Sequence, residues 1–342
     1  MRTIVGVVGC VLLGLTVACG PGTTAPTASH QSSASAAQLS PDQALGVFRA
    51  FGPAFDSVRQ NDAPAQAIEL TTGIQTPAQI FQITTARSRP SLTVPPAGSV
   101  TGARVYVPRL RSFPRWFLAT GTASSTSQAV LFVLVQASRG ATWQAAISTP
   151  NYLGDMAGAL SSIALDSAGY ATVVAPDASG LVVSPASLAA VYARDLNGKP
   201  GATLFAAGPA TSGITASDRQ ISAQTTTFGW RLTDVQRPAR LPVYALRSKN
   251  GGAVVIFVTY DQFSWTALSA AAQLPKSNTQ AAQLTYEPSP DVARAAGVTR
   301  VRAGLRISLN AFGQCIAEVP PSGAGLISVP LYSGGLVSIT KS

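Results

Sequence analysis

The sequence repeats its own pattern of residues at a spacing of 144 positions, and this repeat limits the fold more than any other feature. Ser-Pro pairs at 40–41 and 184–185 each open a segment whose apolar residues recur at helical spacing. The stretch 163–169 also matches the stretch 307–313 at the same offset. An ordered set of matches over this distance predicts that one domain is present twice in the chain.

Each copy is predicted to begin with a helix. Serine at positions 40 and 184 suits the N-cap, and the proline that follows suits the first turn, where no backbone N–H is needed. Ser40 and Gln43 also have the spacing of a capping box. We therefore expect helices that start at Pro41 and at Pro185.

The best-registered part of the repeat predicts two equivalent turns. Asp166 and Asn310 are each followed three residues later by glycine, between apolar stretches. This spacing is typical of a type I turn, in which the last residue takes a positive φ that favours glycine. We expect Gly169 and Gly313 at two hairpin tips, with similar costs when either is replaced.

Two apolar runs indicate strands that are buried on both faces. The runs at 130–135 and 254–258 do not alternate between apolar and polar residues. One face can pack on the helix, and the other must meet the sister domain, a second layer or an apolar pocket. We therefore predict the α+β class, as a tandem duplication of a helix packed on a curved antiparallel sheet, with domains at 39–182 and 183–342. This arrangement resembles the cystatin-like, or nuclear-transport-factor-like, architecture.

The N-terminus has the features of an export signal. A basic start is followed by an uncharged apolar run, which predicts a signal peptide over 1–18. The residues that end in Cys19 resemble a bacterial lipobox, which implies lipidation of Cys19 and anchoring to the outer face of the cell membrane. An ordinary signal peptide or a retained anchor is the alternative. Residues 19–38 are small and almost uncharged, as in a flexible tether, and His30 within them is read as incidental.

The three cysteines agree with this interpretation. Cys10 lies in the predicted leader and Cys19 is the predicted lipid site, which leaves Cys315 as the third cysteine of the chain. No intramolecular disulfide is then possible in the processed protein. Cys315 stands in an apolar run and is predicted to be a small core residue.

The net charge of +10 favours anionic partners, and export makes nucleic acid an unsuitable one. The most distinctive basic segment contains Arg104, Arg109, Arg111 and Arg115 with no acidic residue between them. We expect Arg109 and Arg111 to share one face of a strand, and the segment to bind an anionic envelope polymer, a lipid headgroup or an acidic protein. A solvated strand edge is the alternative. The second copy has a weaker counterpart in Arg231, Arg237 and Arg240, because Asp234 accompanies them.

Trp143 and Trp265 follow the two apolar runs at what the repeat predicts to be equivalent positions. Tryptophan at the end of a long strand is expected to anchor the core. A role in stacking on a ligand is the alternative.

The residues needed for common catalytic and metal sites are missing from the sequence. With His30 set aside, no Ser–His or Cys–His pair can form, and zinc would lack ligands. No phosphate-binding loop and no dinucleotide motif is present, so we expect neither a cofactor nor a metal. The Ser338/Lys341 spacing is read as chance. A pair of carboxylates that are distant in sequence is left open as catalytic chemistry.

The overall pattern resembles duplicated lipoproteins of unknown function from actinobacteria. The residues that carry the resemblance are the leader with Cys19 and the stretches 107–110, 113–117 and 165–172. The resemblance implies no activity. We therefore expect a non-catalytic binding or scaffolding module. The alternatives are a carrier or sensor of a small apolar ligand in a pocket between helix and sheet, and an enzyme that uses carboxylates.

Overall fold

The computed structural model describes residues 38–61, 63–86, 99–124, 127–149, 153–198, 204–274 and 290–342. The predicted leader, Cys19 and His30 lie outside the described residues. Helices and antiparallel strands together place the chain in the α+β class, as predicted. None of the helices in the described ranges is long and apolar enough to cross a membrane.

The first half of the chain builds three helices before its main strands. Its elements are α1 (Pro41–Gln60), α2 (Pro64–Leu70), α3 (Gln75–Ala86), β1 (Val100–Pro108), β2 (Arg115–Ala123), β3 (Ala129–Gln136), β4 (Gln144–Ser148), β5 (Leu153–Gly154), α4 (Met156–Ser161) and β6 (Tyr170–Ala171).

The second half has fewer but longer strands. Its elements are α5 (Pro185–Leu196), α6 (Ser212–Thr227), β7 (Trp230–Pro238), β8 (Tyr244–Arg247), β9 (Ala253–Ala267), α7 (Pro290–Ala295), β10 (Arg306–Val319) and β11 (Ser328–Lys341).

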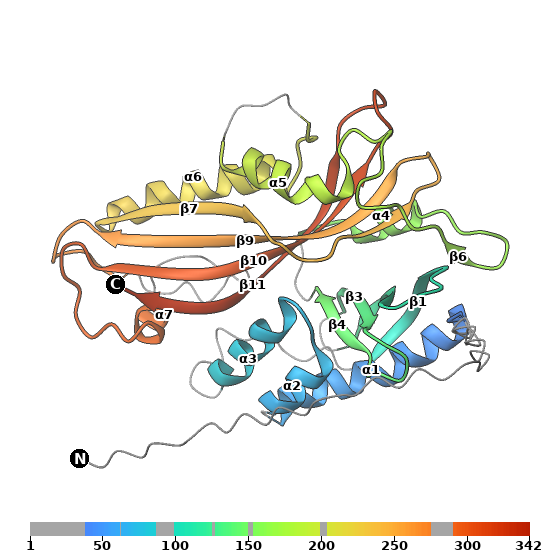
Figure 1. The fold of residues 1–342 in the computed structure, drawn as a ribbon. Coiled ribbons are helices and arrows are strands. Elements are labelled where there is room, and N and C mark those ends of the chain that lie inside the picture. Colours follow the sequence, from blue (N-terminus) through green and yellow to red (C-terminus); the bar gives the residue numbers. More distant parts are fainter. Residues whose placement is uncertain are drawn as a thin grey trace, which may run out of the picture. The chain divides into compact units, whose positions relative to one another are not determined.

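The strands form two sheets (Figure 1). The smaller sheet has the order β4-β3-β2-β1-β6, in which β1 and β6 are parallel and the other pairs are antiparallel. The larger sheet has the order β5-β11-β10-β9-β7, and β8 pairs with the first residues of β9. We call these the small sheet and the long sheet.

The two sheets pack face to face, and each is covered on its other face by a helix. Alternate residues of β3 explain how this works, because Leu131 and Val133 face the long sheet while Phe132 and Leu134 pack with α1. In the long sheet, Val254, Ile256 and Val258 face the small sheet. Ala253, Val255 and Phe257 face α5 instead. The layers are therefore helix, sheet, sheet and helix.

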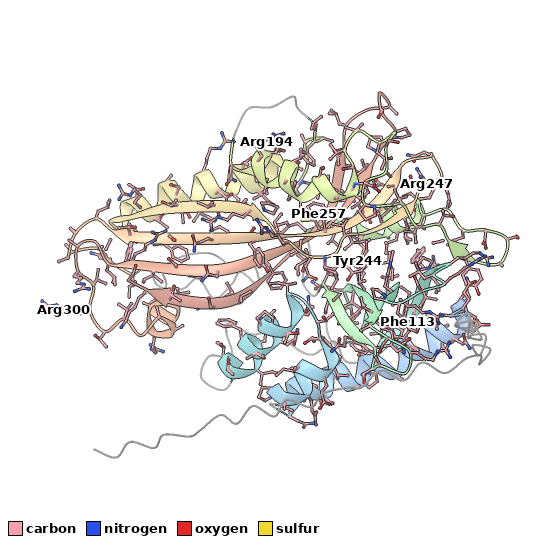
Figure 2. All side chains as sticks on the ribbon, viewed as in Figure 1. Phe113, Arg194, Tyr244, Arg247, Phe257 and Arg300 are labelled. Carbon is pink, nitrogen blue, oxygen red and sulfur yellow. The ribbon has the colours of Figure 1, made fainter. Side chains whose placement is uncertain are left out.

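Aromatic contacts strengthen these layers. Phe48 and Phe55 of α1 pack around Phe132, with ring centroids 5.6 and 5.5 Å away. Tyr244 of the long sheet lies on the side that faces the small sheet (Figure 2). Its ring centroid is 5.1 Å from that of Trp116 in the small sheet. The edge-to-face pairs Phe55–Phe132 and Trp116–Tyr244 add to the gain from apolar burial.

Several predictions about local structure are confirmed. Ser40 and Gln43 form the capping box of α1, and α5 begins at Pro185, although the Ser184 side chain donates to Ser187 and caps no backbone N–H. The apolar runs of β3 and β9 are buried on both faces, because each half of the chain covers the sheet of the other. Cys315 is a fully buried core residue of β10.

The prediction of two equivalent glycine turns is confirmed for Gly169 and wrong for Gly313. Gly169 has a φ of +80° in a turn where Asp166 accepts hydrogen bonds from the backbone of Ala168 and Tyr170, as expected. Gly313 lies in the middle of β10, paired with Thr259 on one side and Gly334 on the other. Its missing side chain leaves room for the Tyr332 ring and does not serve a turn.

Residues 36–342 form one compact unit. Both halves place helices before antiparallel strands. The duplication itself, with a boundary near Val182, stays a prediction.

Candidate functional site

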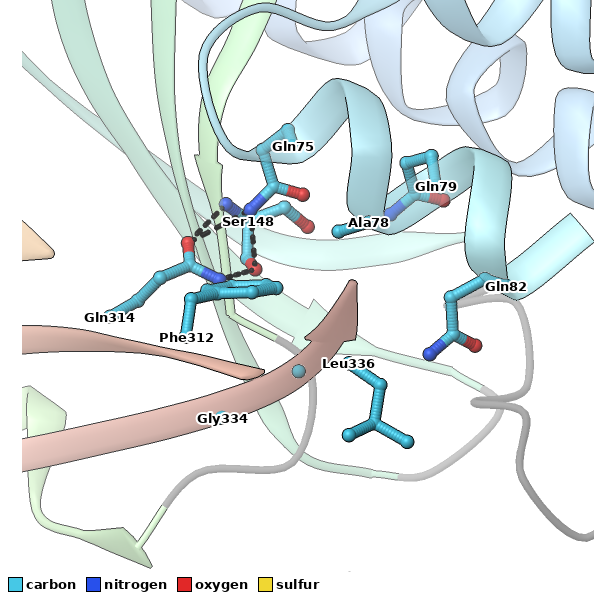
Figure 3. Close-up of a pocket in the computed structure, with 10 residues that line it drawn as sticks. Gln75, Ala78, Gln79, Gln82, Ser148, Phe312, Gln314, Gly334 and Leu336 are labelled. Carbon is cyan, nitrogen blue, oxygen red and sulfur yellow. Dashed lines mark hydrogen bonds between the residues drawn. The ribbon is translucent and has the colours of Figure 1, made fainter. Parts of the chain in front are cut away.

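A hollow between α3 and the long sheet is lined by amide side chains (Figure 3). Its cavity volume is about 30 Å³, and the hollow opens to solvent. We call it the amide pocket. It is lined by Gln75, Ala78, Gln79, Gln82, Ser148, Phe312, Gln314, Gly334, Gly335 and Leu336. None of these residues carries a charge, so the pocket suits uncharged polar groups.

A buried hydrogen-bond network forms one wall of the amide pocket. The Gln314 carboxamide pairs with the Ser148 backbone, accepting from its N–H at 2.9 Å and donating to its carbonyl at 2.9 Å. Gln75 of α3 donates to the Gln314 side-chain oxygen at 3.0 Å. Gln75 and Gln314 are only 1% and 2% exposed. The network therefore ties α3, the end of β4 and β10 together and holds the wall in one arrangement.

Gln79 contributes an acceptor to the same pocket. Its side chain is 7% exposed, and its Oε1 has no hydrogen-bond partner within the described ranges. A buried acceptor without a donor costs about 1–3 kcal/mol. The oxygen is closed to solvent in this arrangement, so a ligand that donates to Gln79 would recover that cost once the side chain turns the oxygen toward the hollow.

Glycines make the sheet side of the pocket flat. A Cβ added at Gly335 would lie 2.6 Å from the Phe312 ring, so the ring rests directly on the backbone of β11. Phe312 thus offers an apolar surface beside the amide groups. Hydrogen-bonding groups next to an aromatic surface suit a ligand with hydroxyl or amide groups and an apolar side.

A second cluster contains three carboxyl groups between α6 and the long sheet. Asp218 comes from α6, Asp234 from β7 and Asp261 from β9. Asp261 stands opposite Gln236 in the strand register, on the face that also carries Asp234. Sequence reasoning had left distant carboxylates open without naming these. Their inward positions become visible only once the strand register is known.

Asp261 is completely buried and held by hydrogen bonds. Tyr332 of β11 donates its hydroxyl to Asp261, and Thr259 donates at 3.3 Å. Burial raises the pKa of Asp261 to about 6, although the hydrogen bonds from Tyr332, Gln236 and Thr259 oppose that rise.

Asp218 and Asp234 interact as a pair. Burial, and then the charge of Asp218, raise the pKa of Asp234 to about 8, while burial raises that of Asp218 to about 6. Two carboxyl groups this close hold one proton more easily than two charges. The pair can therefore exchange a proton near neutral pH. No group of three His, Cys, Asp or Glu among the described residues could hold a metal ion.

The four arginines of the predicted basic surface do not lie on one strand face. β1 ends at Pro108, so Arg109 and Arg111 follow the strand, and the prediction that they share a strand face is wrong. Proline has no N–H with which to extend the ladder. Arg104 of β1 and Arg111 are exposed, whereas Arg115 is buried with its guanidinium 4.7 Å from the Phe113 ring centroid.

Arg109 is engaged by its own neighbours. It contacts Asp166 through Nε at 2.8 Å and Nη2 at 2.7 Å, and lies 4.1 Å from the Tyr170 ring centroid. The backbone N–H of Tyr170 and the Arg109 guanidinium both lower the pKa of Asp166. Arg109 therefore fixes the turn that contains Gly169.

The two tryptophans differ in their surroundings. Trp143 precedes β4 and is partly buried beside Phe117, with ring centroids 5.0 Å apart. Trp265 lies within β9 and is fully buried beside Trp230 and Phe263. Neither lines the amide pocket.

Comparisons with known proteins identify relatives without a described activity. A family model described as "Domain of unknown function (DUF8094)" matches residues 39–323. An "Uncharacterized lipoprotein" of Streptomyces avermitilis is 29% identical over 169 residues, covering 49% of each chain. "Uncharacterized lipoprotein SCO2278" of Streptomyces coelicolor is 28% identical over 188 residues, covering 54% of this chain and 55% of its own. The chain thus matches about half the length of these relatives, and no solved structure matches it.

Proposed function

The chain belongs to the DUF8094 family, and we propose that, like the lipoproteins it matches, it is anchored by a lipid to the outer face of the cell membrane. The lipid is attached at Cys19, which follows the predicted leader in a lipobox-like sequence. Residues 19–38 then serve as the tether between the membrane and the compact unit.

Replacing Cys19 with serine is expected to move the protein out of the membrane fraction or to leave it unprocessed. The hydroxyl of serine cannot take the diacylglycerol that the thiol accepts. Cell fractionation and metabolic labelling with palmitate measure the change. Cys10→Ser, inside the predicted leader, is the matched control and should leave both readouts unchanged. Full labelling of the Cys19→Ser protein would contradict the assignment.

At the membrane surface the protein acts as a non-catalytic binding module, and the amide pocket is its binding site. The observation that carries this proposal is the unpartnered Oε1 of buried Gln79 beside the fixed network of Gln75 and Gln314. The pocket offers hydrogen bonds without charge, so the ligand class is an uncharged molecule with hydroxyl or amide groups, such as a sugar unit. A purely apolar ligand would leave these amide groups without partners.

Binding of a neutral amide-bearing sugar tests the amide pocket. We expect N,N′-diacetylchitobiose to bind weakly to the purified protein in calorimetry. Gln79→Leu should weaken binding about tenfold, because a lost hydrogen bond is worth roughly 1–1.5 kcal/mol. Gln224→Leu, on the exposed side of α6, is the matched control. Equal affinities for the two variants, or no binding by the unaltered protein, would argue against the site.

A second candidate function is hydrolysis, which the Asp218–Asp234 pair favours. A carboxylic acid with a pKa near neutrality beside a carboxylate is a common arrangement for general acid and base chemistry. Release of soluble fragments from cell-wall polysaccharide by the purified protein tests it. Activity that disappears in Asp234→Asn and persists in Asp177→Asn, an exposed loop position, would support an enzyme.

A further inference from the structure

One half of the long sheet carries a polar face that points away from its apolar core. In β7 and β9, Trp230, Phe263 and Trp265 point into the core, so the residues between them point the other way. These alternate residues include exposed Arg231 and Arg237 and the 40% exposed Tyr260. We call the outward residues of 231–237, 260–266, 306–310 and 338–340 the polar sheet face.

The strand register arranges this face in rows. Thr266 stands between Arg231 and Arg306 in the first row. Further along, Ser264 pairs with Ser308 at 2.9 Å, and Arg306 donates to Ser264 at 2.9 Å. Tyr260 stands beside Arg237 in the last row. The residues of one row are about 4.8 Å apart across the strands.

A ladder of amide and hydroxyl groups crosses the middle of the face. Gln262 donates to the Asn310 side chain at 3.0 Å, and Asn310 donates to Ser338 at 2.8 Å. These bonds join β9, β10 and β11 and hold the side chains in fixed positions. Gln262, Asn310 and Ser338 are each partly exposed, whereas Ser264, which accepts from Arg306, is buried.

The polar sheet face is positively charged. Arg231, Arg237 and Arg306 are exposed, and within the described residues none of them forms an ion pair. No carboxylate stands in these rows, because Asp234 and Asp261 occupy the alternate positions that point to the opposite face. An anionic partner would therefore complement this face.

The face is long enough for a chain molecule. From the Arg231 row to the Arg237 row the strand advances six residues, which is roughly 20 Å. A single lipid headgroup would meet one row only. The amide and hydroxyl side chains of the ladder lie between the arginines of the first row and the arginine of the last row. This order of groups complements a polymer in which hydroxyl groups alternate with anionic groups.

We propose that the polar sheet face binds an anionic, polyhydroxylated polymer of the cell envelope, with Arg231, Arg306 and Arg237 contacting its phosphate groups and the Gln262–Asn310–Ser338 ladder contacting its hydroxyls. Arginine suits phosphate because its planar guanidinium donates two parallel hydrogen bonds. The proposal does not depend on the amide pocket, whose residues are left unchanged in the test below.

Binding of the full chain, purified in detergent, to immobilised poly(glycerol phosphate) tests the proposal. We expect Arg231→Gln/Arg306→Gln to weaken binding at least tenfold at low salt, and the remaining affinity to depend less on salt. Arg49→Gln/Arg194→Gln removes the same charge from exposed helix positions outside both basic segments and should leave binding within twofold. Unchanged thermal unfolding confirms that both variants are folded.

Three further ligands separate the alternatives. Dextran, which has hydroxyls without charge, and polyphosphate, which has charge without carbon-bound hydroxyls, should each bind at least tenfold more weakly. Asn310→Ala should reduce binding to poly(glycerol phosphate) but not to polyphosphate.

Equal losses from the two arginine double variants would overturn the proposal in favour of general charge attraction. Tighter binding to anionic phospholipid vesicles than to the polymer would overturn it in favour of a membrane contact.

Discussion

Asp234→Asn is expected to raise the free energy of unfolding, relative to the unaltered protein, by more at pH 8 than at pH 6. Asp234 is largely buried beside Asp218, and its pKa is raised to about 8, first by burial and second by the charge of Asp218. An asparagine at the same position has no charge to bury. Its amide can donate to the Asp218 carboxylate, which removes the repulsion within the pair.

The direction of the pH effect follows from proton linkage. An aspartate in the unfolded chain has a pKa near 3.9, so between about pH 4 and pH 8 the folded protein holds a proton on Asp234 that the unfolded chain has lost. The free energy of unfolding therefore falls as the pH rises through this window. For one proton, the loss between pH 6 and pH 8 is roughly 2 kcal/mol. Asp218 and Asp261, whose pKa values are raised to about 6, add to the fall below pH 6.

Urea unfolding at pH 6, 7 and 8 measures this effect. The difference in unfolding free energy between Asp234→Asn and the unaltered protein should increase by roughly 2 kcal/mol over that range. Asp177→Asn, at an exposed loop position, should show no such trend. A constant difference between Asp234→Asn and the unaltered protein at every pH would mean that Asp234 is ionised in the folded state.

The sequence alone was sufficient to predict the fold class and which strands are covered on both faces. Continuous apolar runs at 130–135 and 254–258 required cover on both faces, and the structure supplies a helix on one side and the other sheet on the opposite side. Helix starts at Pro41 and Pro185 were also readable, because N-caps and proline act locally. Local signals and burial patterns therefore carried these predictions.

The candidate sites depended on contacts that no local pattern records. The amide pocket joins Gln75 to Gln314, which are 239 residues apart, and glutamine has no spacing that distinguishes a pocket wall from a solvated surface. Arg115 was read as a surface charge because arginine is usually exposed, yet it is buried at the start of β2. In the same way, Asp234 appeared only as the acid that weakened the second arginine group.

Gly313 shows the same limitation in one residue. An asparagine three residues before a glycine indicates a turn, and Asn310 and Gly313 fit that rule as well as Asp166 and Gly169 do. The deciding contact comes from Tyr332, on the neighbouring strand β11. Its ring crosses β10 above Gly313 and reaches Asp261 on β9. This arrangement requires a strand position without a side chain, which local sequence cannot distinguish from a turn.

Gly313→Ala is accordingly expected to destabilise the protein by roughly 3 kcal/mol, well above the cost at Gly169. A Cβ at Gly313 would lie 2.4 Å from the Tyr332 ring and 2.9 Å from the Thr259 hydroxyl. The ring cannot move aside without losing its hydrogen bond to buried Asp261. Overpacking costs about 1–3 kcal/mol, and loss of the buried hydrogen bond adds about 1–3 kcal/mol.

Four companion variants separate this steric explanation from a backbone one. Gly169→Ala, at a φ of +80°, should cost only about 1–2 kcal/mol, and Gly169→Asn should cost less, because asparagine tolerates the left-handed region. Gly313→Asn should cost at least as much as Gly313→Ala, because its larger side chain meets the same ring. In a Tyr332→Ala background, Gly313→Ala should add less than about 1 kcal/mol, since contacting residues are not additive. If urea unfolding gives the same cost for Gly313→Ala with and without Tyr332, the ring is not what excludes a side chain from this position.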